Sequence, residues 1–118
     1  MFKKCYTFTS FEKFDFSTKR VENISEMVSN CNNIKYINLD FESQNITNIN
    51  NLFADGSSLT NVNFANLNTN NVNNMSNLFY GYSSLKEIDL SKFNTNNVVS
   101  MNGMFDGFKI RKIIFGRL

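Results

Sequence analysis

The 118-residue sequence contains no histidine, proline or tryptophan, and it has only two cysteines and five glycines. The absence of histidine removes the commonest general base and the commonest metal ligand. Cys5 and Cys31 are too few for a structural zinc site, which needs four such ligands. Gly103 and Gly107 are isolated and belong to no phosphate-loop motif. These absences predict a protein that is not an enzyme and that uses no metal or other cofactor.

Long apolar runs are also missing. No stretch reaches the roughly 18 apolar residues of a membrane-spanning helix, so no membrane span is predicted. The N-terminus carries Lys3 and Lys4 but lacks the apolar run of about 7–15 residues that follows in a signal peptide. The sequence therefore predicts no signal peptide in this chain and leaves its cellular location open.

Charge is segregated along the chain, although the net charge is only +2. Residues 1–20 carry five basic and two acidic side chains, residues 21–108 carry three and eight, and residues 109–118 carry four and none. A nucleic-acid-binding domain instead places a basic stripe along its working face. The position of the cations at the two ends therefore argues against nucleic acid as the partner.

The sequence has an excess of asparagine, with 22 residues, within a regular repeat. Such an excess can indicate a disordered low-complexity tract, but here asparagines alternate with apolar residues at fixed phase, which favours an ordered repeat. Apolar residues recur at Ile34, Leu59, Leu85 and Ile110, with spacings of 25, 26 and 25 residues. A fixed period of this length is typical of stacked repeats. We therefore predict an α/β repeat fold, a short leucine-rich-repeat-type solenoid of about four coils of 25–26 residues.

One apolar series in each repeat has the spacing i, i+3, i+6, i+7. Its members are Val21, Ile24, Met27 and Val28; Ile46, Ile49, Leu52 and Phe53; Val72, Met75, Leu78 and Phe79; and Val98, Met101, Met104 and Phe105. This spacing places side chains on one face of a helix, so it predicts a short helix or 3₁₀ turn packed inward in each repeat. Gly56, Gly81 and Gly107 follow these series, where a chain leaving a helix often needs a left-handed residue.

The segments between these series predict strands. In each segment, the last three or four residues alternate apolar and polar side chains, which is the period of a half-buried strand. The four segments are residues 34–39, 59–64, 85–90 and 110–115. One strand per repeat would form a parallel sheet on the face opposite the helical turns. The predicted inward residues are Ile37, Leu39, Val62, Phe64, Ile88, Leu90, Ile113 and Phe115. The predicted outward residues are Tyr36, Asn38, Asn61, Asn63, Glu87, Asp89, Lys112 and Ile114.

Two sets of asparagines have fixed places in the repeat. Asn45, Asn71 and Asn97 precede the first apolar residue of a series, and Asn23, Asn48 and Asn74 precede the second. Asparagine side chains satisfy backbone groups at turns and tolerate left-handed conformations. We predict that both sets form hydrogen-bonded ladders between repeats; the alternative is that an individual asparagine is only a polar filler.

The whole chain, residues 1–118, is predicted to form one repeat domain. Residues 1–15 are expected to be an irregular N-terminal cap, residues 16–115 the repeats, and residues 116–118 a tail. Cys31 occupies a repeat phase filled elsewhere by Gly56, Tyr82 and Phe108, which favours a small buried apolar role. A disulfide between Cys31 and Cys5 stays open as an alternative.

The repeat resembles a known family. Two segments carry the resemblance: Val72-x-Asn74-Met75-Ser76-x-Leu78-Phe79-Tyr80-Gly81-x-Ser83-Ser84-Leu85 and Leu85-x2-Ile88-Asp89-Leu90-Ser91-x-Phe93-Asn94-Thr95-x2-Val98. They are similar to the BspA-like leucine-rich-repeat surface proteins of the lipoprotein-like repeat branch, over residues 16–115. The resemblance implies an exported or surface-attached protein that binds host or matrix proteins, and it supplies no catalytic residues. The family favours cysteine before Ser-Ser, where this chain has Gly56 and Tyr82.

These observations predict a non-enzymatic protein-binding or adhesion module that uses the exposed sheet face. Outward side chains are not needed to close the core, so they are free to vary between repeats, as a recognition face requires. The candidate contact residues are Tyr36, Asn38, Asn61, Asn63, Glu87, Asp89 and Lys112. A competing interpretation is a structural piece of a longer repeat protein that associates end to end. The plainest alternative is a solvated sheet face without a partner.

Overall fold

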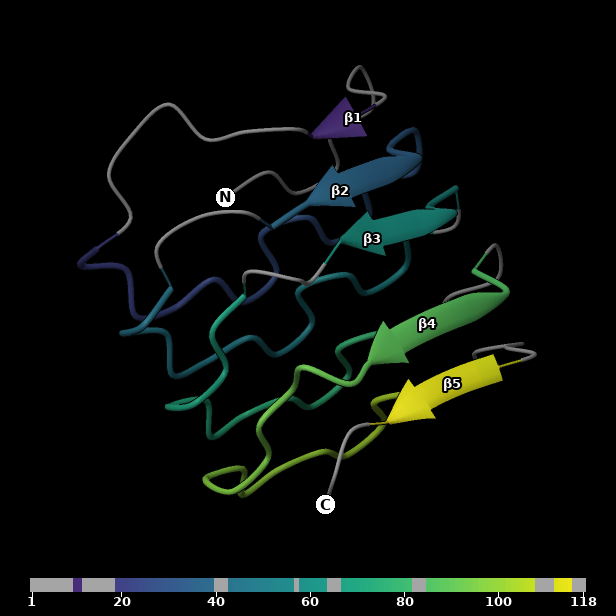
Figure 1. Ribbon diagram of the computed structural model, residues 1–118. Helices are drawn as coiled ribbons and strands as arrows, with labels where there is room; N and C mark the ends of the chain where they lie inside the picture. Colours follow the sequence, from purple (N-terminus) through teal and green to yellow (C-terminus); the bar gives the residue numbers. More distant parts are fainter. Residues whose placement is uncertain are drawn as a thin grey trace.

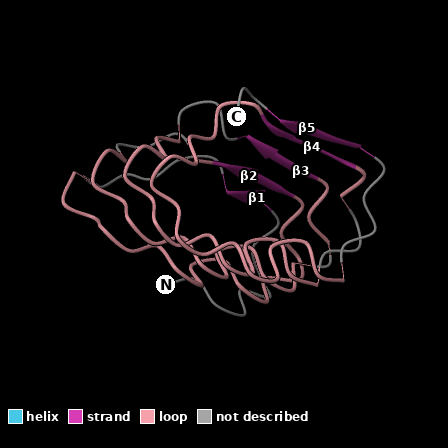
Figure 2. Cartoon of the chain, turned by 90° about the horizontal axis from the view of Figure 1, so that it is seen from below, coloured by secondary structure: helices cyan, strands magenta, loops and turns pink. Residues whose placement is uncertain are grey.

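The computed structural model describes residues 10–11, 19–39, 43–56, 58–63, 67–81, 85–107 and 112–115. Regular secondary structure in these residues consists of short strands: β1 (Ser10–Phe11), β2 (Tyr36–Asn38), β3 (Asn61–Asn63), β4 (Glu87–Leu90) and β5 (Lys112–Phe115). The strands pair in parallel, with β1, β2 and β3 in one sheet and β4 and β5 in another. Figure 1 shows them stacked in sequence order, and Figure 2 shows the chain passing from strands on one side to turns on the other.

The predicted fold class was wrong. The described residues contain no helix of any kind, and the strands form two separate sheets instead of one continuous sheet. An α/β solenoid of the leucine-rich-repeat type, with helical turns on one face, is therefore not what the chain forms. β1 also lies within residues 1–15, which were expected to be irregular. Since these segments hold no helix, none of them offers a helix long and apolar enough to cross a membrane.

Consecutive β-turns occupy the segments for which helices were predicted. In the first repeat, the N–H groups of Met27 and Cys31 donate to carbonyl groups three residues earlier, at 3.2 and 3.4 Å. The alternate N–H groups, of Ile24 and Val28 for example, donate to carbonyl groups of the next repeat at 3.1 Å. A helix would need each N–H to bond within its own segment. The spacing of the apolar residues does not distinguish the two arrangements, because both place the same side chains inward.

The turns depend on left-handed residues at two fixed positions of each repeat. The first column has φ values of 54–66° and consists of Glu26, Asn51, Asn77 and Gly103. The second has φ values of 58–74° and consists of Asn30, Asp55, Gly81 and Gly107. A positive φ at the third residue of a turn favours glycine or asparagine, which accounts for six of the eight residues but not for Glu26 and Asp55. The predicted left-handed conformation is confirmed at Gly81 and Gly107 but wrong at Gly56, where Asp55 takes that place.

The core lies between the strands and the turns. From the predicted series, the buried residues are Ile24, Met27, Val28, Ile46, Ile49, Leu52, Phe53, Val72, Met75, Leu78, Phe79 and Met104. Of the predicted inward strand residues, Ile37, Leu39, Ile88 and Leu90 are buried and Val62 and Ile113 are half-buried; Ile34, Leu59 and Leu85, at the starts of the strand segments, are buried too. The rings of Phe53, Phe79 and Phe105 stack nearly parallel, with centroids 5.5 and 5.9 Å apart. Phe64 and the side chain of Phe115 lie outside the described residues.

Burial is incomplete in the fourth repeat. Met101 was predicted to point inward, yet it is 45% exposed, whereas the corresponding Ile24, Ile49 and Met75 are at most 5% exposed. Val99 is 86% exposed. Among the described residues, no further repeat packs against this side of Met101. Inward spacing alone therefore does not bury Met101, although Met104 of the same repeat is buried.

Cys31 was predicted to fill a small buried apolar position. Cys31 is buried, as expected, and its thiol donates to the carbonyl oxygen of Ser29 at 3.8 Å. Cys5 lies outside the described residues, as do most of the predicted cap and the predicted tail at residues 116–118.

Candidate functional site

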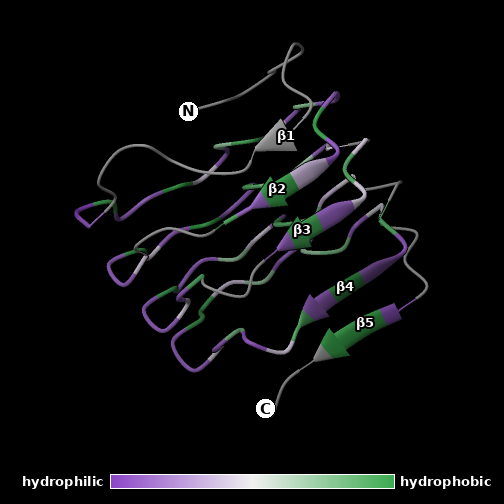
Figure 3. Cartoon of the chain, turned by 45° about the horizontal axis from the view of Figure 1, so that its top comes forward, coloured by the Kyte–Doolittle hydropathy of each residue, from purple (hydrophilic) through white to green (hydrophobic). Residues whose placement is uncertain are grey.

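The candidate site is the outer face of β2, β3, β4 and β5, called here the strand face. Within each sheet, its residues pair in the predicted register: Tyr36 with Asn61, Asn38 with Asn63, Glu87 with Lys112, and Asp89 with Ile114. The predicted columns, however, were continuous across all four strands. They are interrupted between β3 and β4, because these strands belong to different sheets. Figures 1 and 3 show β4 and β5 set apart from the other strands.

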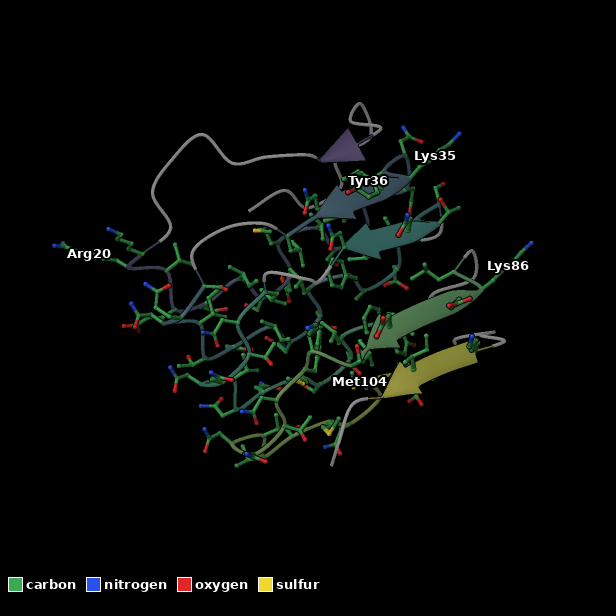
Figure 4. All side chains as sticks on the ribbon, in the orientation of Figure 1. Arg20, Lys35, Tyr36, Lys86 and Met104 are labelled. Carbon is green, nitrogen blue, oxygen red and sulfur yellow. The ribbon has the colours of Figure 1, made fainter. Side chains whose placement is uncertain are left out.

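The predicted contact residues differ in exposure. The exposed residues are Asn61, Glu87, Asp89 and Lys112, and the half-buried residues are Tyr36, Asn38 and Asn63. Figure 4 shows the Tyr36 ring on β2, with Lys35 and Lys86 projecting where β2 and β4 begin. The strand face therefore has one partly sheltered aromatic ring surrounded by amide and charged groups.

Two grooves lie at the interruption between β3 and β4. The first, of about 480 Å³, is lined by residues 60–62 and 85–89. The second, of about 390 Å³, is lined by Tyr36, β3, Asp89, Ser91 and Lys92. Five of the seven predicted contact residues line at least one groove: Tyr36, Asn61, Asn63, Glu87 and Asp89. Asn38 and Lys112 line neither of them.

The acidic residues of β4 have different partners. Oε1 of Glu87 lies 4.0 Å from Nζ of Lys112, but both side chains are more than half exposed, so this pair contributes little to stability. Hydrogen bonds from Ser91, first from its side chain and then from its N–H at 2.9 Å, lower the pKa of Asp89. Lys92 adds to this effect, while desolvation opposes it. Asp89 therefore carries a negative charge in both grooves at neutral pH.

The predicted asparagine ladders lie on the other side of the molecule, near the edge that Arg20 marks in Figure 4. The side-chain amides of Asn45, Asn71 and Asn97 donate to backbone carbonyl groups of the preceding repeat, the latter two at 2.7 Å. This prediction is confirmed. Loops on this side are hydrophilic in Figure 3. Their asparagine amides nevertheless serve to join neighbouring repeats.

The second set of asparagines bonds differently from the prediction. The side-chain oxygens of Asn23, Asn48 and Asn74 accept the N–H two residues later, at 2.8–3.0 Å, within their own turn. It is their backbones that bridge adjacent repeats, continuing to Ser100. The side chains of this set therefore shape single turns and do not form a ladder.

Several residues that line the grooves were not predicted from the sequence, notably Thr60, Val62, Lys86 and Lys92. Val62 was assigned to the core, and the others to no site. No sequence signal marks them, because they line a groove only where β3 and β4 separate. In the part of the chain that the structure describes, no group of three or more cysteine, aspartate or glutamate side chains could hold a metal ion.

Comparison with protein families matches residues 1–112 to the family described as "Mycoplasma protein of unknown function, DUF285". Because the match spans nearly the whole chain, the protein belongs to this family. Comparisons with curated proteins and with solved structures found no match. The description of the family names no activity.

Proposed function

We propose that this protein is a non-catalytic protein-binding module and that its partner contacts the strand face. The main support is the convergence of five predicted contact residues on two adjoining grooves. The first groove combines apolar side chains, from Val62 and Ile88, with the amide of Asn61 and the carboxylates of Glu87 and Asp89. Contact surfaces of this kind provide both apolar burial and directional hydrogen bonds.

The two sides of the stack also differ in how their polar groups are used. On the turn side, the amides of Asn45, Asn71 and Asn97 are bonded to backbone carbonyl groups. One N–H of each amide is therefore already used to join neighbouring repeats. On the strand face, Asn61 and Lys112 are exposed and differ in chemistry, although both stand at the same position of their repeats.

Variation between repeats supports the same surface. Aligned outward positions hold a tyrosine, an amide, a carboxylate and an ammonium group, in Tyr36, Asn61, Glu87 and Lys112. Aligned inward positions stay apolar throughout. The resemblance of the repeat to BspA-like surface proteins, which implies binding of host or matrix proteins, also supports a protein partner.

A pair of substitutions tests the strand face. With a partner identified by pull-down, we expect Tyr36→Ala combined with Asp89→Ala to weaken binding by about tenfold or more, equivalent to about 1.4 kcal/mol. The melting temperature should change only slightly, because Tyr36 is half-buried and Asp89 is exposed and loses only its hydrogen bonds with Ser91. Isothermal titration calorimetry and thermal unfolding measure the two quantities.

The matched control changes the opposite side. Tyr80 is 45% exposed and Asp106 is exposed, so Tyr80→Ala combined with Asp106→Ala removes the same two kinds of side chain. We expect this control to bind normally. Normal binding by the Tyr36 and Asp89 variant, with loss of binding in the control, would place the contact on the turn side and refute the proposal.

A second candidate function is end-to-end assembly, and the exposed side chains of Val99 and Met101 favour it. A further repeat or a second copy stacked there would bury Met101, as the stack buries the corresponding Ile24, Ile49 and Met75. If this assembly occurs, Val99→Ser combined with Met101→Ser should abolish concentration-dependent association in sedimentation velocity, whereas Tyr80→Ser should leave it intact. A chain that stays monomeric at every concentration would eliminate this candidate.

A further inference from the structure

The second and third repeats are joined on one side only. On the turn side, the N–H groups of Ile49, Asn51, Phe53 and Asp55 donate to carbonyl groups of the third repeat, at 2.7–3.2 Å. On the strand side, β3 and β4 belong to different sheets, and no backbone hydrogen bond joins them among the described residues. The two repeats therefore form a wedge that is closed at the turns and open between the strands. We call this opening the β3–β4 break.

The hydrogen bonds of β3 show which of its backbone groups face the break. In a parallel strand, the N–H and C=O of one residue point to one neighbour, and those of the next residue point to the other. The N–H of Asn61 donates to Lys35 at 3.2 Å, and the C=O of Asn63 accepts from Leu39 at 3.1 Å. Both residues are thus directed toward β2, so the backbone N–H and C=O of Val62 are directed toward the break.

A hydrogen bond beside β4 shows in the same way which of its backbone groups face the break. The C=O of Lys86 accepts from the N–H of Lys112 at 3.2 Å, so Lys86 is directed toward β5. The backbone groups of Glu87 and Asp89 consequently point away from β5, toward the break. Two strand edges whose donors and acceptors have no backbone partner among the described residues therefore face each other across the first groove, which both strands line.

We infer that the β3–β4 break is a binding site for one extended peptide strand of a partner protein. This inference rests on the proposed function and names the part of the strand face that would make the contact. Addition of a strand to an exposed sheet edge is a common mode of peptide recognition, in which main-chain hydrogen bonds provide the affinity. Here both edges of the bound strand would be satisfied, by Val62 on one side and by Glu87 and Asp89 on the other.

The neighbouring side chains define the chemistry of the occupant. Val62 and Ile88 form the inner floor of the groove, and the outer positions hold Asn61, Glu87 and Asp89. A strand between them needs an apolar residue pointing inward, flanked by polar residues pointing out. The segment Tyr36-Ile37-Asn38 has this alternation and forms β2 in the same stack. Insertion requires β3 and β4 to stand about 9.6 Å apart, twice the ordinary strand spacing of about 4.8 Å.

A reversible clamp tests the site. The native thiols are first removed by Cys5→Ser and Cys31→Ala. Asn61→Cys and Glu87→Cys then place one thiol on each side of the break. A disulfide requires Cα atoms about 4.4–6.8 Å apart, so oxidation holds the break closed. The probe is a synthetic peptide with the sequence of residues 34–40. We expect the oxidised clamp to bind this peptide at least about tenfold more weakly than the reduced form.

The matched control clamps two strands that are already paired. The control carries Tyr36→Cys and Asn61→Cys, which are partner positions in β2 and β3. A disulfide between them leaves the β3–β4 break open. We expect its oxidised and reduced forms to bind the peptide equally. Equal binding by the oxidised and reduced forms of the Asn61 and Glu87 clamp would overturn the inference.

Amide hydrogen exchange locates the bound peptide without cysteine substitutions. We expect the peptide to slow exchange about tenfold or more at Val62, Glu87 and Asp89, because their N–H groups gain partners. Exchange at Asn61 should change little, since its N–H is already bonded to Lys35. A peptide that leaves Val62, Glu87 and Asp89 unprotected overturns the site.

The outcomes separate this inference from the proposed function. One outcome is that the variant with Tyr36→Ala and Asp89→Ala loses binding of the identified partner while the oxidised clamp still binds the peptide normally. That result would support the strand face as the contact surface and exclude the break as the peptide site. Normal partner binding by that variant, combined with protection of Val62 by the peptide, would keep the break as a peptide site and remove the proposed role of the Tyr36 and Asp89 side chains in binding the partner.

Discussion

The side chain of Asp55 lies over Gly81, and its carboxylate oxygen takes up the space that a Cβ atom would need at residue 81. The side chain of Asn77 lies in the same way over Gly103. Each pair joins left-handed positions of neighbouring repeats. These glycines are therefore required by the side chain stacked on them as well as by their own backbone conformation.

Gly81→Ala is expected to destabilise the fold by about 2 kcal/mol or more. The left-handed conformation alone costs an alanine about 1–2 kcal/mol, and displacement of the Asp55 carboxylate adds to this cost. Urea denaturation measures the difference. Asp55→Gly combined with Gly81→Ala removes the clash and should recover part of the loss; a double variant no more stable than Gly81→Ala would show that Asp55 is not the cause.

Phe79→Ala is expected to cost about 3–5 kcal/mol of unfolding free energy. The Phe79 ring is fully buried and lies between the rings of Phe53 and Phe105, so its loss leaves a cavity that both neighbours border. The adjacent Tyr80, which is 45% exposed, is the matched control, and Tyr80→Ala should stay within about 0.5 kcal/mol of wild type. Equal melting temperatures for the two variants would contradict this packing.

Asn71→Asp should lower stability, whereas Asn70→Asp should not. The amide of Asn71 donates to the carbonyl of Gln44 at 2.7 Å, and a carboxylate cannot make that bond. Asn70 instead accepts, from the amide of Asn94 at 3.1 Å, and a carboxylate keeps that role. We expect a loss of about 1 kcal/mol for Asn71→Asp and little change for Asn70→Asp. Because both residues are exposed and both variants add the same charge, similar losses would indicate a charge effect instead.

The pKa of Asp89 should be measurably low because of Ser91. Carboxyl NMR titration is expected to give a midpoint below the ordinary value of 3.8, and Ser91→Ala should raise it toward that value. Since the folded pKa is the lower one, the stabilisation is present above the unfolded pKa and is lost as pH falls through the folded pKa. Ser91→Thr retains the hydroxyl group and should keep the low midpoint. An unchanged midpoint in Ser91→Ala would exclude the Ser91 hydroxyl group as the cause.

Part of the fold was predictable because it repeats. The period of 25–26 residues identified the inward side chains and the in-register parallel strands, and Ile37, Leu39, Phe53 and Phe79 are buried as expected. The prediction of helices was wrong. The spacing of the apolar residues fits a run of turns with left-handed residues as well as it fits a helix. Hydrogen bonds between repeats decide between turns and helix, and they leave no signal in the local sequence.

The candidate site was predictable only within each sheet. The pairing of Tyr36 with Asn61 and of Glu87 with Lys112 follows from their equal places in adjacent repeats. The β3–β4 break does not follow, since the same repeat pattern continues through it. The sequence by itself determined the period, the inward residues and the bonding role of Asn71, because these depend on residue type at fixed spacing. Only the tertiary structure decided which repeats pair along their strands, because that depends on backbone bonds between residues about 25 positions apart.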